Sequence, residues 1–430
     1  MTAPGTPETI RRTQTRKLRV LLSALAERNP FYQPRILAAN LDPATCTTAD
    51  FVTAFPFTTR DEWTRDQLDH PPYGTNFTFS AESYTRLCRT SGTAGRAMNW
   101  LDTPESWSAM LDQWDRVYIA AGVEAGTGIF FAFSFGPFLG FWTAFEAASR
   151  RGCLCVPGGG LSTPARLDLL VETASTVLCC TPTYAARLAE TARLEGRERD
   201  LSSVEKIIVA GESGGSVPAV RSRLSDAWGG ARIYDHHGMT EVGPVSYPCP
   251  HTEDRLHVME ESYLAEVVAS AGAEAAAEGE AGELVLTTLD RMGSPLLRYR
   301  TGDRVVSQRH APCDCGAFDL SLEGGIRGRD DDMVTVRGVN VFPSAVDSVV
   351  QRSDPVEEYE TVRRTVNGMD ELIVRIEFNE GTGDAEAERA RLAEAFERAL
   401  GLRVGIEIVD AGSLPRYQFK AQRWKVARPE

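Results

Sequence analysis

Short apolar runs alternate with helical stretches between residues 127 and 235. The runs that are short enough to be buried strands are 129–133, 153–156, 177–180 and 207–210. Residues 107–121 and 165–174 favour crossover helices, and Thr181-Pro182 predicts a helix start because threonine caps a helix and proline suits its first turn. This alternation is typical of βαβ units and predicts a parallel sheet that helices cover on both faces.

The two ends of the chain follow other patterns. Residues 8–45 are expected to be mostly helical, because leucines recur there at helical spacing, as Leu18, Leu21, Leu22 and Leu25. The strands expected at 283–288 and 297–306 favour a small β-barrel or antiparallel sheet, with an exposed acidic loop at 271–282 before them.

The last hundred residues resemble a small independent unit. The expected strands are 333–336, 372–378 and 404–409, and the expected helices are 343–351 and 386–400. This order is βαββαβ-like. We therefore expect an α/β protein with a large N-terminal lobe (1–328), which includes a β subdomain at about 245–328, and a small mobile C-terminal α+β lobe (329–430) on a hinge.

Composition and charge narrow the functional classes. The 430 residues carry 46 basic and 60 acidic side chains, a net charge of -14, which disfavours a nucleic-acid module or an anionic membrane as partner. Residues 1–20 show no signal peptide, and no apolar run is long enough to span a membrane. Nine cysteines, an odd number in a long chain, favour reduced thiols in a cytoplasm.

Four polar motifs along the chain are candidates for function, but each of them, taken alone, could also be an ordinary turn, loop or linker. The stretch RTSGTAGR could cradle a phosphate or be a surface turn, and YDHHGMTEVGP could hold a phosphate and Mg²⁺ or be a loop at the edge of the core. The aspartate of YRTGD could bind ribose hydroxyls or end a turn, and GRDDDMVTVRGVNVFP could be a charged linker. These motifs lie at 89–96, 234–244, 299–303 and 328–343.

Taken together, in this order and spacing, the four motifs resemble the adenylate-forming superfamily that includes the acyl-CoA synthetases. The segments GRDDDMVTVRGVNVFPSAVD, ELVLTTLDRMGSPLLRYRTGD and LPRYQFKAQR are most similar to its phenylacetate–CoA ligase branch. The resemblance covers residues 50–430 and implies an enzyme, an AMP-forming acid–thiol ligase. Its cofactors would be ATP, Mg²⁺ and coenzyme A, with a small carboxylic acid as substrate.

The resemblance also implies residue roles. The loop that wraps the β- and γ-phosphates would be Ser91, Gly92, Thr93 and Gly95. The segments on either side of adenine would be Gly211, Glu212 and Ser213, and Asp235, His236 and His237. Thr240 would meet the α-phosphate and Glu241 would hold Mg²⁺; Asp303 would bind the ribose, with Arg329 near it. Asp331 would be the hinge, and Lys420 would bridge the acyl carboxylate and the phosphate, although a solvated surface lysine is the alternative.

Three positions depart from the pattern of the branch: Ala94 replaces a hydroxyl residue, Arg96 a lysine, and His237 a tyrosine. The leading hypothesis is an aryl-acid–CoA ligase. The alternatives are an enzyme that passes the acyl group to an amine, a hydroxyl or a carrier protein, and a nucleotide-binding regulator without the reaction. Dimers are common in the branch, so a homodimer is compatible with the sequence, although no interface is visible in it.

A cysteine-rich set suggests a second, structural site. Cys313 and Cys315 form a tight pair, Cys249 lies upstream, and His251 and His257 are both candidates for a fourth ligand. Three cysteines and one histidine make a closed tetrahedral set for Zn²⁺, whereas free thiols are the alternative. The branch pattern, in which the histidine follows a leucine, favours His257.

The segment FFAFSFGPFLGF is rich in phenylalanine. Phe131 and Phe133 are expected in the core, whereas the nearby glycines suggest that later rings border a cavity. An aromatic acid such as a benzoate, an amino- or hydroxybenzoate or phenylacetate would suit it. The candidate pocket residues are Phe135, Phe141, Ala210, Gly211, His237 and Gly238.

Overall fold

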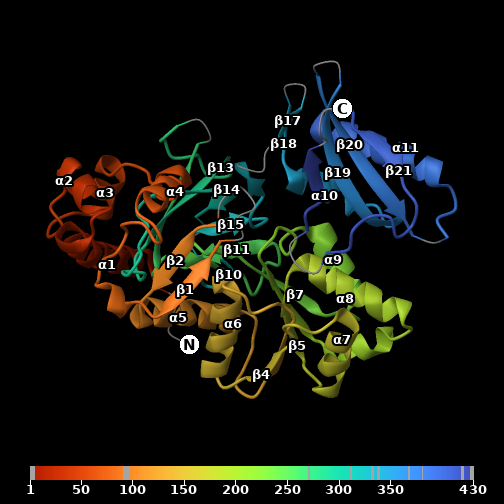
Figure 1. The fold of residues 1–430 in the computed structure, drawn as a ribbon, viewed down its shortest axis with the longest axis horizontal. Coiled ribbons are helices and arrows are strands. Elements are labelled where there is room, and N and C mark those ends of the chain that lie inside the picture. The colour runs from red at the N-terminus through yellow and green to blue at the C-terminus, as the bar shows by residue number, and fades with distance from the viewer. Residues whose placement is uncertain are drawn as a thin grey trace.

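The computed structural model describes residues 5–90, 97–269, 272–309, 312–330, 334–336, 339–366, 369–379, 381–417 and 421–426. Within these ranges the chain forms a large lobe, built on two main sheets, and a small lobe with a sheet of its own (Figure 1). The expected fold class, with a βαβ large lobe, a β subdomain and an α+β C-terminal lobe, is confirmed.

A five-stranded parallel sheet forms the centre of the large lobe. Its strands are β3 (Gly128–Phe131), β4 (Leu154–Pro157), β5 (Val177–Cys180), β6 (Lys206–Ala210) and β7 (Arg232–His236), and they lie in the order β4-β3-β5-β6-β7. Alternate side chains enter different hydrophobic clusters: Phe131 and Cys179 one, Phe130 and Leu178 the other. This alternation explains the continuous apolar runs, because both faces of each strand are buried.

Helices cover both faces of this sheet, as the sequence predicts. They are α5 (Pro104–Ala120), α6 (Leu139–Arg150), α7 (Thr163–Glu172), α8 (Pro182–Leu194) and α9 (Pro218–Ala227), with a 3₁₀ turn η2 (Glu198–Ser203) after α8. Residues of α5 and α6 pack in the cluster of Phe131, and residues of α7, α8 and α9 in that of Phe130. The start of α8 is confirmed, because the hydroxyl of Thr181 accepts a hydrogen bond from the Tyr184 amide at 3.2 Å.

The β subdomain is a seven-stranded antiparallel sheet. Its strands are β10 (Ser246–Pro248), β11 (Arg255–Val258), β12 (Tyr263–Val268), β13 (Ala281–Thr288), β14 (Tyr299–Gln308), β15 (Ser321–Glu323) and β16 (Gly328–Arg329). Two hairpins, β1 (Arg86–Arg89) with β2 (Asn99–Asp102) and β8 (Gly238–Met239) with β9 (Gly243–Pro244), complete the strands of the large lobe.

The N-terminal segment is helical and packs on the antiparallel sheet. It comprises α1 (Pro7–Arg28), α2 (Gln33–Ala38), α3 (Thr48–Ala54), α4 (Arg60–Asp69) and a 3₁₀ turn η1 (Ala81–Ser83). The leucine stripe of α1 is fully buried and shares a hydrophobic cluster with Leu264, Leu289 and Leu297. Among the described residues, no helix combines the length and the apolar character needed to cross a membrane.

The small lobe is a four-stranded sheet with two helices. Its elements are β17 (Val334–Val336), β18 (Val339–Val341), α10 (Pro343–Val350), β19 (Val356–Val366), β20 (Met369–Phe378), α11 (Ala385–Leu400), β21 (Gly405–Ile408) and β22 (Trp424–Val426). The sheet order is β21-β20-β19-β22, and β17 pairs with β18 in a separate hairpin. In Figure 1 this lobe, in blue, lies beside α8 and α9.

Candidate active site

Two of the predicted motifs meet where adjacent parallel strands end. Ala210, the last residue of β6, pairs in register with His236, the last residue of β7, so the segment after each strand starts at the same edge of the sheet. Carboxyl ends of parallel strands are the usual place for a ligand in such sheets. Gly211 has a φ of +94°, which only glycine adopts readily, and the chain turns there directly after β6.

Asp235 is buried, and its hydrogen bonds stabilise the loops at this edge of the parallel sheet. Its carboxylate accepts a hydrogen bond from the Ser216 hydroxyl at 2.5 Å and one from the His236 amide at 3.0 Å. A Cβ at Gly215 would lie 2.4 Å from an Asp235 oxygen, so only glycine fits against it. Burial raises the pKa of Asp235, while the Ser216 hydrogen bond opposes that rise. Ser216 was not among the predicted site residues.

His236 is buried in the core of the large lobe. Its ring centroid lies 4.3 Å from that of Trp114 on α5, and Nδ1 lies 2.7 Å from the Ser246 carbonyl oxygen, to which it donates in the neutral form. Burial lowers its pKa to about 3, so the ring stays neutral at physiological pH. The neutral ring packs against Trp114 as part of the core.

His237, Asp303 and Arg329 form a chain of ionic hydrogen bonds. Nε2 of His237 lies 2.9 Å from one Asp303 oxygen, and Nη1 of Arg329 donates to the other at 2.7 Å. Asp303 and Arg329 also pair in register between β14 and β16. Asp303 is 2% exposed. The structure thus brings together three residues from separate motifs, and their bonds fix the direction of the Asp303 carboxylate.

Thr240 and Glu241 lie in the turn between β8 and β9. The guanidinium of Arg291 holds this turn, because its Nη1 donates to the carbonyls of Thr240 and Glu241 at 2.7 and 2.8 Å. Arg291 in turn forms a bidentate pair with Asp102 at the end of β2, with both bonds 2.7 Å long. Neither of these buried residues was predicted, because a lone arginine or aspartate in a sequence carries no sign of such a pairing.

Glu241 is a buried carboxylate near positive charge. Burial raises its pKa, and the guanidinium groups of Arg60 and Arg329 act in the opposite direction. A carboxylate oxygen is the kind of ligand that Mg²⁺ prefers, so the residue fits the metal role expected of it.

Glu212 has both carboxylate oxygens occupied. Oε1 accepts a hydrogen bond from the Thr183 amide at the start of α8 at 2.8 Å, and Oε2 accepts one from the Ala421 amide of the small lobe at 3.0 Å. Glu212 therefore joins the large lobe to the C-terminal segment, a contact that sequence reasoning did not foresee. Ser213 lies beside it and borders the cleft between the lobes.

Several predicted residues lie outside the described part of the chain. They are Ser91, Gly92, Thr93, Ala94, Gly95 and Arg96 of the first motif, the hinge candidate Asp331, and Lys420. The hairpin that flanks the first motif is described: Arg89 of β1 pairs with Asn99 of β2.

Aromatic rings line the sheet edge beside the β8–β9 hairpin. Phe141 of α6 stacks on Phe133 with ring centroids 4.2 Å apart, and Phe135 meets Phe145 edge-on at 5.2 Å. Phe131 and Phe133 are buried, as the sequence predicts. Helix α6 also contacts the hairpin, in which Gly238 has no room for a side chain because a Cβ would lie 2.8 Å from the Gly243 carbonyl oxygen.

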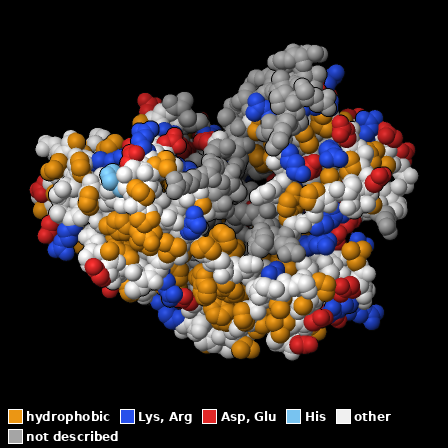
Figure 2. All heavy atoms as spheres, in the orientation of Figure 1, with side chains coloured by type: hydrophobic (Ala, Val, Ile, Leu, Met, Phe, Trp, Pro, Cys, Tyr) orange, Lys and Arg blue, Asp and Glu red, His pale blue; other side chains and the backbone are white. Residues whose placement is uncertain are grey.

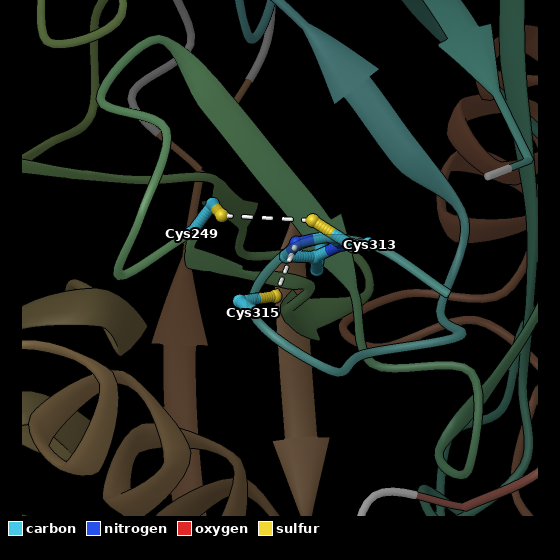
Figure 3. Close-up of side chains that lie close together, drawn as sticks. Cys249, Cys313 and Cys315 are labelled. Atoms are coloured by element: carbon cyan, nitrogen blue, oxygen red, sulfur yellow. Dashed lines mark hydrogen bonds between the residues drawn. The ribbon is translucent and has the colours of Figure 1, made fainter. Parts of the chain in front are cut away.

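The four predicted thiol and imidazole ligands converge on β10, β11 and the loop before β15. The ligand atoms of Cys249, His257, Cys313 and Cys315 all lie within 4.8 Å of one another, and Figure 3 shows the cysteine side chains turned toward a common centre. His251 is exposed and does not belong to this group. Sequence spacing alone left the two histidines open, and the pairing of β10 with β11 brings His257 to the cysteines.

The distances within this cluster match a tetrahedral ion. A Zn²⁺ with its usual bond lengths holds two sulfurs about 3.8 Å apart and a sulfur and a nitrogen about 3.6 Å apart. Sγ of Cys249 lies 3.9 Å from Sγ of Cys313, and Sγ of Cys315 lies 3.4 Å from Nε2 of His257. Burial acts to raise the pKa of Cys313, but hydrogen bonds from the Cys315 amide and Arg255 lower it overall. Burial raises the pKa of Cys315 to about 12, so the pKa shifts of the two thiols do not agree, and the geometry carries the metal assignment.

Known proteins of one family match nearly the whole chain. The sequence model of the AMP-binding enzyme family matches residues 32–289, and that of the AMP-binding enzyme C-terminal domain matches residues 338–428. A phenylacetate-coenzyme A ligase of Thermus thermophilus is 30% identical over 429 residues, which cover 95% of this chain and 94% of that protein.

Solved structures agree with this match. 2-Hydroxyisobutyryl-CoA ligase in the postadenylation state, in complex with R3-HIB-AMP, is 26% identical with a TM-score of 0.91, covering 99% of this chain and 91% of that one. The same ligase in the thioesterification state, in complex with 2-HIB-AMP and CoA, gives a TM-score of 0.73 at the same identity and coverage. The chain therefore belongs to the AMP-binding enzyme family, in its phenylacetate–CoA ligase-like branch of adenylate-forming acid–thiol ligases.

Proposed function

We propose that this enzyme activates an aryl carboxylic acid with ATP and transfers the acyl group to coenzyme A. A carboxylate oxygen attacks the α-phosphorus, pyrophosphate leaves, and an acyl-adenylate forms. The thiolate sulfur of coenzyme A then attacks the acyl carbon, and AMP leaves with the electron pair of the bond that breaks. The acids that fit are benzoate, amino- or hydroxybenzoates and phenylacetate.

The wall of aromatic rings beside the nucleotide residues carries this proposal. Phe133 and Phe141 stack, Phe135 lies next to them, and α6 contacts the hairpin that holds Thr240 and Glu241. An aromatic acid that enters between these rings and the Ala210–Gly211 turn would gain edge or offset ring contacts beyond simple burial. Its carboxylate would then face the hairpin, where the α-phosphate is expected.

The proposed nucleotide roles are those that the resemblance to the family implies. The loop of Ser91, Gly92, Thr93 and Gly95 would bind the outer phosphates, and Thr240 the α-phosphate. Asp303, held by His237 and Arg329, would accept the ribose hydroxyls. Gly211, Ser213, Asp235 and His236 would shape the adenine pocket through their backbone, since Asp235 and His236 use their side chains inside the fold.

Glu241 is the residue that would hold Mg²⁺. The ion supplies positive charge that offsets the charge of the phosphates when the acid attacks. The protein contributes a buried carboxylate whose turn is fixed by Arg291, so that the ligand oxygen is in place before the nucleotide arrives.

The lobes of residues 1–328 and 329–430 would turn relative to each other at Asp331 between the half-reactions. Lys420 would offset charge at the phosphate and acyl carboxylate in the first of them. Coenzyme A is the favoured acceptor, since the relatives named above are CoA ligases and one solved structure contains CoA. In the β subdomain, Cys249, His257, Cys313 and Cys315 would hold a structural Zn²⁺, which leaves no position open for catalysis.

An ATP–pyrophosphate exchange panel tests the substrate class. It should contain benzoate, 2-aminobenzoate, 4-hydroxybenzoate and phenylacetate, with 2-hydroxyisobutyrate and acetate as aliphatic acids. We expect exchange with at least one aryl acid and formation of its thioester only when coenzyme A is added. Exchange with the aliphatic acids alone would contradict the aromatic assignment, and exchange without any thioester would favour an amine, hydroxyl or carrier-protein acceptor.

A further inference from the structure

Charged side chains gather where the small lobe meets α8 and α9 (Figure 2). A cleft of about 450 Å³ separates the lobes here, with Arg187 and Glu190 on the large-lobe side and Glu357 and Arg416 on the other. Arg416 lies 3.5 Å from Glu190 across this boundary. The boundary is therefore polar, and such contacts separate at lower cost than an apolar interface because water can replace the partners.

Glu212, which lies just after the end of β6, forms a further contact between the lobes. Its carboxylate accepts the Thr183 amide of the large lobe and the Ala421 amide of the small lobe. A carboxylate has two oxygens that only accept, so it can hold two N–H donors at once, and hydrogen bonds to a charged acceptor are the strong ones. The Thr183 amide is one of the free donors of the first turn of α8. One side chain thus links the start of a helix to the C-terminal segment.

The lobe arrangement in which this contact forms resembles one state of a relative more than another. The TM-score is 0.91 with 2-hydroxyisobutyryl-CoA ligase in the postadenylation state and 0.73 with the same ligase in the thioesterification state. A lobe set differently relative to α8 could not keep both bonds of Glu212, because the Thr183 amide belongs to the large lobe and the Ala421 amide to the small one.

We propose that Glu212 is a positioning residue for adenylate formation, because it holds the C-terminal segment on the large lobe and lets it go before thioester formation. This inference rests on the proposed function. Ala421, whose amide Glu212 binds, directly follows Lys420 in the chain. Glu212 acts through that segment and needs no contact with the nucleotide.

The variant Glu212→Gln tests this role. The amide has the shape of the carboxylate but only one acceptor oxygen, so one of the two backbone donors loses its partner. We expect the kcat for adenylate formation to fall about 10-fold, which matches the loss of one charged hydrogen bond. The KM for ATP should stay the same, and so should the rate of thioester formation from chemically prepared acyl-adenylate and coenzyme A. The acid used is the one that the wild type activates fastest in the exchange panel.

A matched control comes from the same helix. Thr181→Ala removes the other cap of α8, the bond from the Tyr184 amide, without touching the small lobe. It should lower Tm and leave the ratio of the two half-reaction rates unchanged. A fall of both half-reactions alike in Glu212→Gln would indicate a merely structural role, and a higher KM for ATP at unchanged kcat would indicate a contact with adenine. Either result would overturn the proposal.

Hydrogen exchange gives a readout that does not depend on activity. The Ala421 amide, measured in a peptide that begins several residues before it, should exchange faster in Glu212→Gln than in the wild type, and no faster in Thr181→Ala. Equal exchange in the wild type and Glu212→Gln would refute the inference, even if no acid in the panel proves to be a substrate. A wild type that forms no acyl-adenylate with any acid, but in which this exchange difference appears, would instead refute the proposed function and keep the contact.

Discussion

The β subdomain carries two polar clusters that differ in how their groups are satisfied. At one, Asp303 receives hydrogen bonds from His237 and Arg329, so the protein supplies partners for the carboxylate. At the other, the ligand atoms of Cys249, His257, Cys313 and Cys315 lie close together, and the protein supplies only weak hydrogen bonds to sulfur, from the Thr252 amide and Arg255. The protein's own side chains hold the first cluster, whereas we propose that the second is fully stabilised only by a bound cation.

The two clusters should therefore respond differently when one of their residues is substituted. Removing one member of the paired cluster should mainly weaken nucleotide binding, since the fold around it has many other contacts. Removing one member of the thiol cluster should remove the ion and hence a cross-link between β11 and the loop before β15.

The largest effect is expected at the thiol cluster. Cys313→Ser should abolish the one bound zinc ion per chain and lower the free energy of unfolding by about 3 kcal/mol, since metal binding contributes directly to folding. Metal analysis and denaturant unfolding measure this, with Cys153→Ser, a thiol outside the cluster, as control. A wild type that contains no zinc, and whose unfolding is indifferent to a chelator, would show that these are ordinary free thiols.

At the paired cluster, Asp303→Asn should lower kcat/KM for ATP about 100-fold, which corresponds to about 2.7 kcal/mol of lost transition-state stabilisation. An asparagine keeps one acceptor but loses the charge that Arg329 and His237 face. The initial rate at varied ATP concentration is the measurement. Glu266→Gln is the matched control, because Glu266 of β12 forms a partly buried bidentate pair with Arg298, and its loss should lower stability with ATP kinetics unchanged.

The neighbouring His236 predicts a dependence of stability on pH. Its pKa is about 3 in the folded protein against 6.5 in an unfolded chain, so between these values only the unfolded state takes up the proton. Stability is therefore lost as the pH falls. Between pH 7 and pH 5 the wild type should lose about 2 kcal/mol more than His236→Gln, measured by urea unfolding at both pH values. Equal losses in the two proteins would mean that His236 takes up its proton in the folded state.

The smallest effect concerns His237, which the branch usually replaces with tyrosine. His237→Phe keeps a ring but removes the donor to Asp303, which retains Arg329. The KM for ATP should rise about 5-fold, because a single hydrogen bond contributes about 1 kcal/mol. His70→Phe, an exposed histidine, is the control. A KM that does not change would mean that Arg329 alone fixes the carboxylate, and the cluster would then be a simple ion pair.

The sequence predicted the parallel sheet well because burial on both faces leaves a plain signal. The expected strand 177–180 matches β5, and the cap at Thr181 begins α8. Strand β19 was missed, since its interior contains acidic residues: Glu358 is buried in a bidentate pair with Arg423, and Glu360 binds Arg375 and Lys425. The sequence alone does not distinguish a buried carboxylate with a distant partner from an exposed one. The pairing of β19 with β20 and with β22 brings these charges together.

The candidate site was predicted unevenly for a similar reason. Motif residues such as His237 and Asp303 were identified, and the structure brings them together. The supports behind them, Arg291, Asp102 and Ser216, could not be found, because each acts through tertiary contacts that span up to 189 positions of the chain. The role of Glu212 between the lobes was hidden as well, since its partners lie 29 and 209 positions away.

The pair Arg291–Asp102 has a consequence for exchanging segments between relatives. Asp102 ends the hairpin of β1 and β2, and Arg291 holds the carbonyls of Thr240 and Glu241. Two loops that are far apart in sequence therefore share one anchor. A chimera that takes either segment from a relative with a different residue at 102 or 291 would leave a buried charge without its counterion, which costs several kcal/mol. In a chimera of family members, positions 102 and 291 should therefore be taken from the same parent.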